Sequence, residues 1–308
     1  MPIRLYATLF AGLAGLAFGS FLNVCLTRWP AGESIVKPRS HCRSCDRTLA
    51  WWENIPLVSW ITLRGRCRTC GAWIGWRYPL VELAVGGLWA AAAWRVLDSQ
   101  TLDQLLFVHS LPVTIYISVS IGVGDLVLYW LLVALAVLDA EHFWLPDWAT
   151  LPGICVGFLF VLVRETMIGE SGSMKYAAKR AALGSIASIL AAALLILLIR
   201  WTYKLLRKRE GIGLGDAKLM AMLAAWLGLA GALLSFFIGV VLGALTGLVL
   251  LALPAKSANE QSAGEANTST PSWALRKLPL GTFLCIGGIV TGLWGQPILA
   301  AYLRWAGF

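Results

Sequence analysis

The stretch GIGLGDAKLMAMLAAWLGLAGALL, residues 211–234, places one carboxylate, Asp216, among glycines directly before a long apolar run. A basic run that includes Lys204 and Lys208 precedes it. A helix that crosses a bilayer needs about 20 mostly apolar residues. The stretch therefore predicts a membrane helix that begins beside an acid, an unusual place for a charge unless the acid has a function.

The composition of the 308-residue chain is that of a polytopic membrane protein. Hydrophobic residues make up 58% of it and charged residues 13%, and the mean hydropathy is +0.74. Soluble domains carry about 25% charged residues, so an arrangement of two soluble domains is excluded. The net charge of +9 is interpreted by position, because Lys and Arg concentrate in the cytoplasmic loops of membrane proteins. We expect no nucleic-acid partner.

The fold class that we predict is an all-α membrane protein with about eight transmembrane helices. The apolar segments are 4–26, 79–97, 104–138, 148–165, 180–201, 217–231, 232–253 and 278–303. We expect 104–138 to cross the membrane once, with its early part interfacial or bent at Pro112. Segment 254–277 has the composition of a flexible loop.

Charge predicts which helix ends face the cytoplasm. Residues 27–78 carry nine basic residues against three acids, and Arg200 to Lys218 carries six against two. Both regions should be cytoplasmic, with the N-terminus outside. The first segment, residues 1–26, also resembles a secretory signal peptide, but the basic residues after it favour a retained first helix.

Two C-x-x-C pairs lie in the basic segment 27–78. The pairs are Cys42 with Cys45 and Cys67 with Cys70, and 21 residues separate them. This spacing is close to that of a zinc ribbon, in which four thiolates hold a structural Zn²⁺. Two disulfides or one redox pair are the alternatives, although a reducing cytoplasm disfavours disulfides. We predict a small zinc-ribbon-like domain inserted after the first helix.

Acids lie at the ends of predicted spans. In LAVLDAEHFWLPDW, residues 135–148, Asp139 ends one apolar segment before the next begins. Two clear spans separate Asp139 from Asp216, so both should return to the same face. Two close carboxylates cannot both ionise easily, and such a pair can activate a water while it polarises a carbonyl. For a single isolated acid, a helix cap or a surface ion pair is the simpler interpretation.

A third acid repeats the letters of the motif. Gly122, Gly124 and Asp125 have the same G-x-G-D spacing, inside the apolar region. Fourteen helical residues at about 1.5 Å each would place Asp125 roughly 21 Å from Asp139, too far for a shared water. We expect Asp125 to be a partnered or near-interface acid.

These motifs belong to a pattern that covers nearly the whole chain and resembles the type IV prepilin peptidases, bacterial intramembrane aspartyl proteases of the GxGD type. The similar blocks are FGSFLNVCLTRWP, PRSHCRSC, ENIPLVSWITLRGRCRTCGAWIGWRYPLVEL, LDAEHFWLPDW, GIGLGDAKLMAMLAAWLG and LPLGTFLCIGG. The resemblance implies that Asp139 and Asp216 form a catalytic dyad at the cytoplasmic face of the inner membrane, within a protease core over 79–308.

The resemblance also implies the reactions and the partners. A prepilin or pseudopilin of a type IV pilus or type II secretion system would bind through its transmembrane segment, within membrane lipid. It would be cut after the glycine that ends its leader, and S-adenosylmethionine would methylate the new N-terminus. Glu82 is a candidate for methyl transfer, although an acid in a helix's first turn is also a favourable dipole partner. The residues expected to support the peptidase site are Gly213, Gly215, Lys218, Pro146 and Asp147.

Other functions stay open on the sequence alone. One is a peptidase without methyltransferase activity, and another is a zinc-ribbon membrane adaptor that catalyses nothing. A third is a proton-coupled transporter, which would place acids deep within spans, whereas Asp139 and Asp216 lie at span ends.

Overall fold

A computed structural model describes residues 2–97, 111–168, 174–208, 213–252 and 278–307 of the chain. In these residues the fold is helical, as expected. The helices are α1 (Pro2–Arg28), the short η1 (Trp51–Asn54) and α2 (Val58–Thr62), α3 (Arg77–Val96), α5 (Leu111–His142), α6 (Asp147–Ile168), α7 (Met174–Arg207), α8 (Leu214–Ala252) and α9 (Leu280–Trp305). The loop predicted over 254–277 lies outside the described residues.

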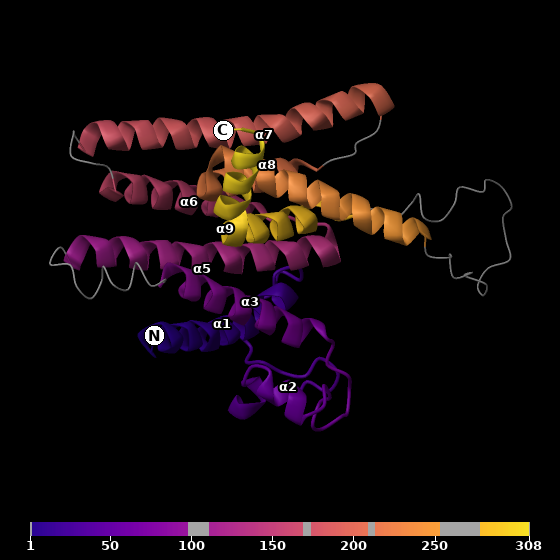
Figure 1. The fold of residues 1–308 in the computed structure, drawn as a ribbon. Helices are drawn as coiled ribbons and strands as arrows, with labels where there is room; N and C mark the ends of the chain where they lie inside the picture. Colours follow the sequence, from indigo (N-terminus) through magenta and orange to yellow (C-terminus); the bar gives the residue numbers. More distant parts are fainter. Residues whose placement is uncertain (1, 98–110, 169–173, 209–212, 253–277, 308) are drawn as a thin grey trace, which may run out of the picture.

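Helix α5 lies between two groups of helices (Figure 1). One buried cluster joins α1 and α3 to α5, and it includes Leu22, Val85 and Leu138. A second cluster joins α5 to α8 and α9, with Leu132 and Leu223 among its members. Because α5 contributes to both clusters, the position of its C-terminal end is fixed from two sides.

Small residues let α1 and α3 approach each other closely. A Cβ atom on Gly15 would lie 2.9 Å from the Cα of Gly86, and one on Gly19 would lie 2.8 Å from the Cα of Glu82. Backbones this close are typical of membrane helices that pack through small residues. The contact places Glu82 directly against α1.

Six of the described helices are long and apolar enough to cross a membrane: α1, the part of α5 from Gly122, α6, α7, α8 and α9. The sequence predicts eight spans, and the difference has two sources. Helix α3, which carries Arg77, Glu82 and Arg95, is not one of the six. The spans predicted over 217–231 and 232–253 both fall within α8.

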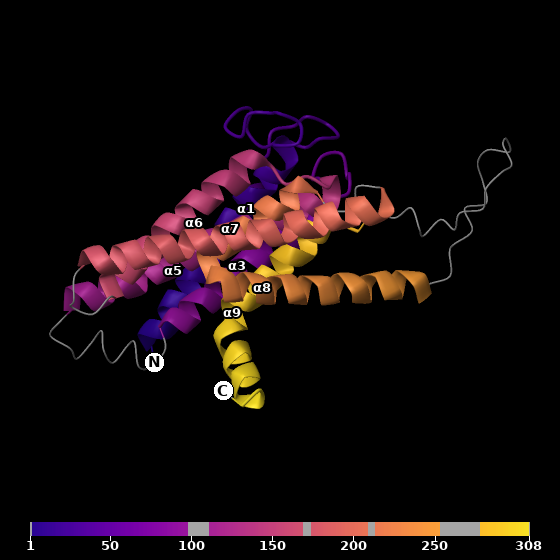
Figure 2. The same ribbon diagram turned by 90° about the horizontal axis from the view of Figure 1, so that it is seen from above.

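Helix α8 is broken at Gly228, where φ is 71° and ψ is 176°. Positive φ is accessible to glycine at little cost. In Figures 1 and 2 the chain turns back at this break, so that the two parts of α8 form a V. The two predicted spans are therefore joined without a loop.

The long segment 104–138 is described from residue 111 onward, where it forms the single helix α5. Pro112 is the second described residue of that helix. Residues 104–110, with the interfacial stretch expected there, lie outside the described residues.

Several helix ends converge at one end of the bundle, which we call the polar end. Arg77 at the start of α3 donates to the Glu141 carboxylate near the end of α5 and to the Thr27 hydroxyl near the end of α1, both at 2.7 Å. Lys218 near the start of α8 pairs with Asp147 at the start of α6. The cysteine-bearing segment between α1 and α3 lies at the same end (Figure 2).

Candidate active site

Asp139 lies in the last turn of α5 at the polar end, and it is only 6% exposed. Its Oδ2 atom accepts hydrogen bonds from the backbone N–H of Thr282 at 2.7 Å and from the Thr282 hydroxyl at 3.2 Å. A Cβ atom on Gly281 would lie 2.9 Å from the Asp139 Cγ. The start of α9 therefore orients this carboxylate, and glycine is needed where the chain passes it.

Asp216 lies in the first turn of α8 and is 8% exposed. Its Oδ2 atom accepts a hydrogen bond from the Gly213 N–H at 3.1 Å. The bond resembles half of a capping box, in which a side chain reaches back to an N–H that the helix cannot pair. An acid in the first turn also interacts favourably with the helix dipole.

Both carboxylates line one cavity of about 530 Å³, a volume in the range usual for small binding sites. The described residues that line it are Asp139, Phe143, Trp144, Leu145, Asp147, Gly213, Gly215, Asp216 and Lys218. The two motifs that lie far apart in the sequence are thus brought to the same place. A pair of acids facing one cavity is suited to the activation of a water.

The other expected site residues divide into two groups. Gly215 lines the cavity, and a Cβ atom on it would lie 3.0 Å from the Leu145 Cβ. Lys218 forms its ion pair with Asp147 at the edge of the same cavity. Pro146 is not part of the described cavity wall; its carbonyl accepts the Thr150 N–H at 3.0 Å at the start of α6.

Glu82 does not reach this cavity. It lines a separate cavity of about 690 Å³ between α1, α3 and the cysteine-bearing segment. Asp125 lines a third cavity, of about 980 Å³, together with Arg164 and Arg180. The acid that repeats the G-x-G-D letters is therefore separate from the pair formed by Asp139 and Asp216.

Gly281 and Thr282 were not among the residues expected at the site. Both lie in the LPLGTF block at the start of the last predicted span. A glycine and a threonine at that boundary could have raised the question of a polar contact. The local sequence, however, does not specify a hydrogen-bond partner 143 positions earlier in the chain.

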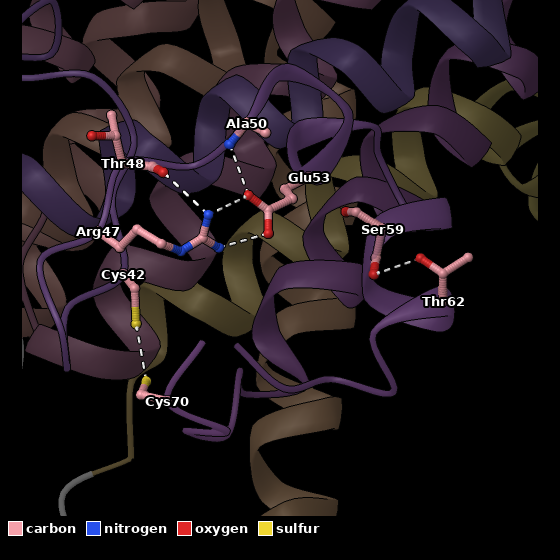
Figure 3. A network of polar contacts seen from close by, with 8 residues as sticks. All are labelled: Cys42, Arg47, Thr48, Ala50, Glu53, Ser59, Thr62 and Cys70. Atoms are coloured by element: carbon pink, nitrogen blue, oxygen red, sulfur yellow. Dashed lines mark hydrogen bonds and ion pairs between the residues drawn. The ribbon is translucent and has the colours of Figure 1, made fainter. Parts of the chain in front are cut away.

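The four cysteines of the two C-x-x-C pairs meet in space. The Sγ atoms of Cys42, Cys45, Cys67 and Cys70 all lie within 4.8 Å of one another. Figure 3 shows Cys42 and Cys70, whose sulfurs are 3.8 Å apart. Zn–S bonds of about 2.3 Å in a tetrahedron place sulfurs about 3.8 Å apart, so the cluster fits zinc. All seven cysteines of the chain are free thiols.

The two cysteine pairs lie on matching turns. The Cys42 N–H donates to the Arg47 carbonyl at 2.9 Å, and the Cys67 N–H donates to the Ala72 carbonyl at 2.8 Å. The fourth residue after the first cysteine of each pair, Asp46 or Gly71, has a positive φ. Backbone N–H groups of Cys70 and Thr69 lower the pKa of the Cys67 thiol to about 6, whereas at Cys45 the lowering by the Arg47 backbone N–H is outweighed by burial and the other three sulfurs, which raise its pKa to about 11. The thiolate, which is the form that binds metals, is thereby favoured at Cys67.

An ion pair with a buried carboxylate supports the turn that carries Cys42 and Cys45. Glu53, whose side chain is 1% exposed, accepts hydrogen bonds from Arg47 at 2.6 and 3.0 Å and from the Ala50 N–H at 2.7 Å (Figure 3). The Arg47 guanidinium holds the pKa of Glu53 below its usual range. The carboxylate thus remains charged and ties Arg47 to η1.

The fold and the site define a helical membrane protein with two aspartates on one cavity and a four-cysteine cluster at the same end. Comparison with known families is specific. Residues 126–248 match the model of the Type IV leader peptidase family, and residues 13–96 match the Bacterial Peptidase A24 N-terminal domain. The chain belongs to the type IV leader peptidase family, which confirms the resemblance seen in the sequence.

Curated relatives match over nearly the full length. A protein of Stutzerimonas stutzeri is 33% identical, over 97% of this chain and 94% of the relative. One of Pseudomonas aeruginosa is 32% identical, over 96% and 93%, and one of Myxococcus xanthus is 35% identical, over 88% and 73%. All three are named prepilin leader peptidase/N-methyltransferase. No solved structure matches this chain.

Proposed function

We propose that this protein is a membrane aspartyl endopeptidase that removes the leader of a prepilin or pseudopilin after a glycine and then N-methylates the new N-terminus. The observation that carries the proposal is the shared cavity of Asp139 and Asp216 at the polar end. The names of the full-length relatives support both reactions.

In the peptidase reaction, Asp139 and Asp216 share the attacking water. One carboxylate takes a proton from the water as its oxygen adds to the scissile carbonyl, and the other donates a proton to the departing amine. Thr282 holds Asp139 in a fixed orientation during these transfers. Gly213 leaves room for an unwound substrate backbone beside Asp216, and Gly215 lets Leu145 pack closely against the start of α8.

The orientation follows from charge. The basic segment 27–78 and the basic end of α7 belong in the cytoplasm, so the polar end is cytoplasmic and the N-terminus lies outside. If α3 and both parts of α8 each cross the inner membrane, the count of eight spans is restored. The substrate's transmembrane segment enters sideways from the lipid, and its leader junction reaches the cavity at the cytoplasmic surface.

We propose that Cys42, Cys45, Cys67 and Cys70 bind one structural zinc ion. Four sulfurs leave no open coordination position, so the metal stabilises the segment between α1 and α3 and takes no part in hydrolysis. Metal analysis of the purified protein should give one zinc per chain, and Cys67→Ser should lower that content. Cys155→Ser, which changes an exposed thiol of α6, is the control and should leave it unchanged.

Incubating the purified protein with a prepilin, with and without S-adenosylmethionine, tests the two reactions together. The product mass should fall by the leader in both cases and rise by one methyl group only when the donor is present. Cleavage without methylation would reduce the function to that of a peptidase. Absence of cleavage would favour the membrane adaptor.

A further inference from the structure

We propose that the cavity between α1, α3 and the cysteine-bearing segment binds S-adenosylmethionine, with Glu82 facing the positively charged sulfur and Asn23 accepting a hydrogen bond from the ligand. The inference rests on the proposed methyltransferase function and assigns its donor site. The cavity has a volume of about 690 Å³, within the usual range of about 300–1,000 Å³ for ligand sites.

The cavity wall carries both arginines and acids, and Glu82 is the acid that we assign to the cationic sulfur. Glu82 lines the cavity and is 7% exposed. Its Oε2 atom accepts the Leu57 N–H at 2.8 Å. A carboxylate can accept about four hydrogen bonds, so this contact leaves capacity for a ligand. A buried acid calls for a compensating positive charge, and S-adenosylmethionine carries one on its sulfur.

Asn23 provides a second and independent indication of a ligand. It lines the same cavity and is 2% exposed. Its Nδ2 atom donates to the Tyr78 carbonyl at 2.9 Å, whereas its buried Oδ1 atom has no hydrogen-bond partner in the part of the chain that the structure describes. Buried polar atoms are nearly always satisfied. An ammonium or hydroxyl group of a bound ligand would supply the donor that Oδ1 lacks.

An aromatic side chain offers a surface for the purine. Trp60 lines the cavity, and its Nε1 atom donates to the Ile74 carbonyl at 3.1 Å. Its ring packs against that of Trp76 with centroids 4.5 Å apart. The indole is therefore held in place, and nucleobases stack well on such rings.

The cavity adjoins the place where the new amine would form. Thr27 lines its wall and accepts the hydrogen bond from Arg77, which also binds Glu141. Glu141 lies two residues after Asp139 in α5. One arginine thus joins the wall of this cavity to the helix end that carries a proposed catalytic acid. The larger cavity, lined by Asp125, starts about four helical turns away along α5.

The test measures binding, not turnover. Equilibrium binding of S-adenosylmethionine and of S-adenosylhomocysteine, whose sulfur is neutral, is compared in the purified full-length protein. Glu82→Gln keeps the shape but removes the charge, so affinity for S-adenosylmethionine should fall about tenfold while affinity for the neutral ligand changes less. Glu165→Gln, which removes an exposed acid of α6, should leave both affinities unchanged.

Asn23→Leu is the second variant and should weaken the binding of both ligands. It removes a hydrogen-bond acceptor, and the hydrogen bond to that acceptor does not depend on the charge of the ligand's sulfur. Leader cleavage by each variant reports whether the protein is folded. If the wild type binds neither ligand, the methyltransferase part of the proposed function fails. If the wild type binds, but Glu82→Gln keeps the preference for the charged ligand and Asn23→Leu keeps the affinity, then the donor site is elsewhere and the proposed function stands.

Discussion

The letters G-x-G-D occur twice in this chain, and the two copies lie in different surroundings. Residues 213–216 span the start of α8 at the polar end, where Asp216 and Asp139 line one cavity. Residues 122–125 lie inside α5, where Asp125 lines a different cavity with Arg164. The same four-residue motif therefore contains an acid that shares a cavity with Asp139 in one copy and an acid that lines a separate cavity in the other.

The glycines of the two copies also differ in what they do. Gly213 precedes α8, so its N–H has no partner within the helix and binds the Asp216 carboxylate. Gly124 lies within a helix, and a Cβ atom there would lie 2.2 Å from the ring of Phe160. At the start of α8 the motif's glycine binds an acid that shares a cavity with a second acid, whereas inside α5 its glycine serves packing.

Replacing the acids should give the largest difference in leader cleavage between the two copies of the motif. Asp216→Asn or Asp139→Asn keeps the size of the side chain but removes the group that exchanges the proton. The initial rate of leader cleavage should fall about 10³-fold, or about 4 kcal/mol in activation free energy. Asp125→Asn should cleave at the wild-type rate. If Asp125→Asn were as impaired as Asp216→Asn at equal membrane levels, the distinction between the two copies would be wrong.

Replacing the packing glycine should affect stability rather than chemistry. Gly124→Ala introduces a methyl group against Phe160, so the free energy of unfolding should fall by about 1–3 kcal/mol. Gly122→Ala is the matched control, because its Cβ would make an ordinary contact 3.8 Å from Val96. Thermal unfolding measures both variants. Equal unfolding temperatures would show that Phe160 moves aside without cost.

The sequence was sufficient for the features that depend on local composition. Apolar runs predicted the helices, and the spacing of the cysteines predicted a cluster that the structure forms. Counting spans also predicted that Asp139 and Asp216 would return to the same end. These inferences need only the length of a membrane helix and the ligand chemistry of thiolates.

Features that depend on packing between distant segments were not predictable. The break in α8 occurs at Gly228, yet Gly231 lies in the same apolar run and is equally free of a side chain. The contact of Thr282 with Asp139 requires α9 to pack beside α5, which no local pattern specifies. The link from Arg77 to Glu141 and Thr27 is likewise decided by three helix ends meeting in space.

Removing the Thr282 hydroxyl should slow leader cleavage less than replacing either acid of the site. Thr282→Val removes a hydroxyl that lies 3.0 Å from the Ala136 carbonyl and 3.2 Å from the Asp139 Oδ2, but it keeps the backbone N–H at 2.7 Å from that carboxylate. Cleavage should slow about tenfold, or about 1.4 kcal/mol. Thr282→Ser should restore the rate, and Thr246→Val, whose hydroxyl bonds within α8, should not change it. If Thr282→Val cleaved at the wild-type rate, the hydroxyl would not be needed, and the backbone N–H of residue 282 would be sufficient to orient Asp139.

Breaking the ion pair of Lys218 with Asp147 should have the smallest effect on the cleavage rate, because the two side chains are 34% and 61% exposed. Exposed pairs contribute at most about 1 kcal/mol, so Lys218→Met and Asp147→Asn should each slow cleavage less than about fivefold. If the residues act only through each other, the double variant should be no slower than either single variant. A Lys218→Met protein much slower than Asp147→Asn would instead mean that the ammonium contacts the substrate. The lysine would then distinguish this copy of the motif from residues 122–125, where Leu126 and Val127 follow the acid.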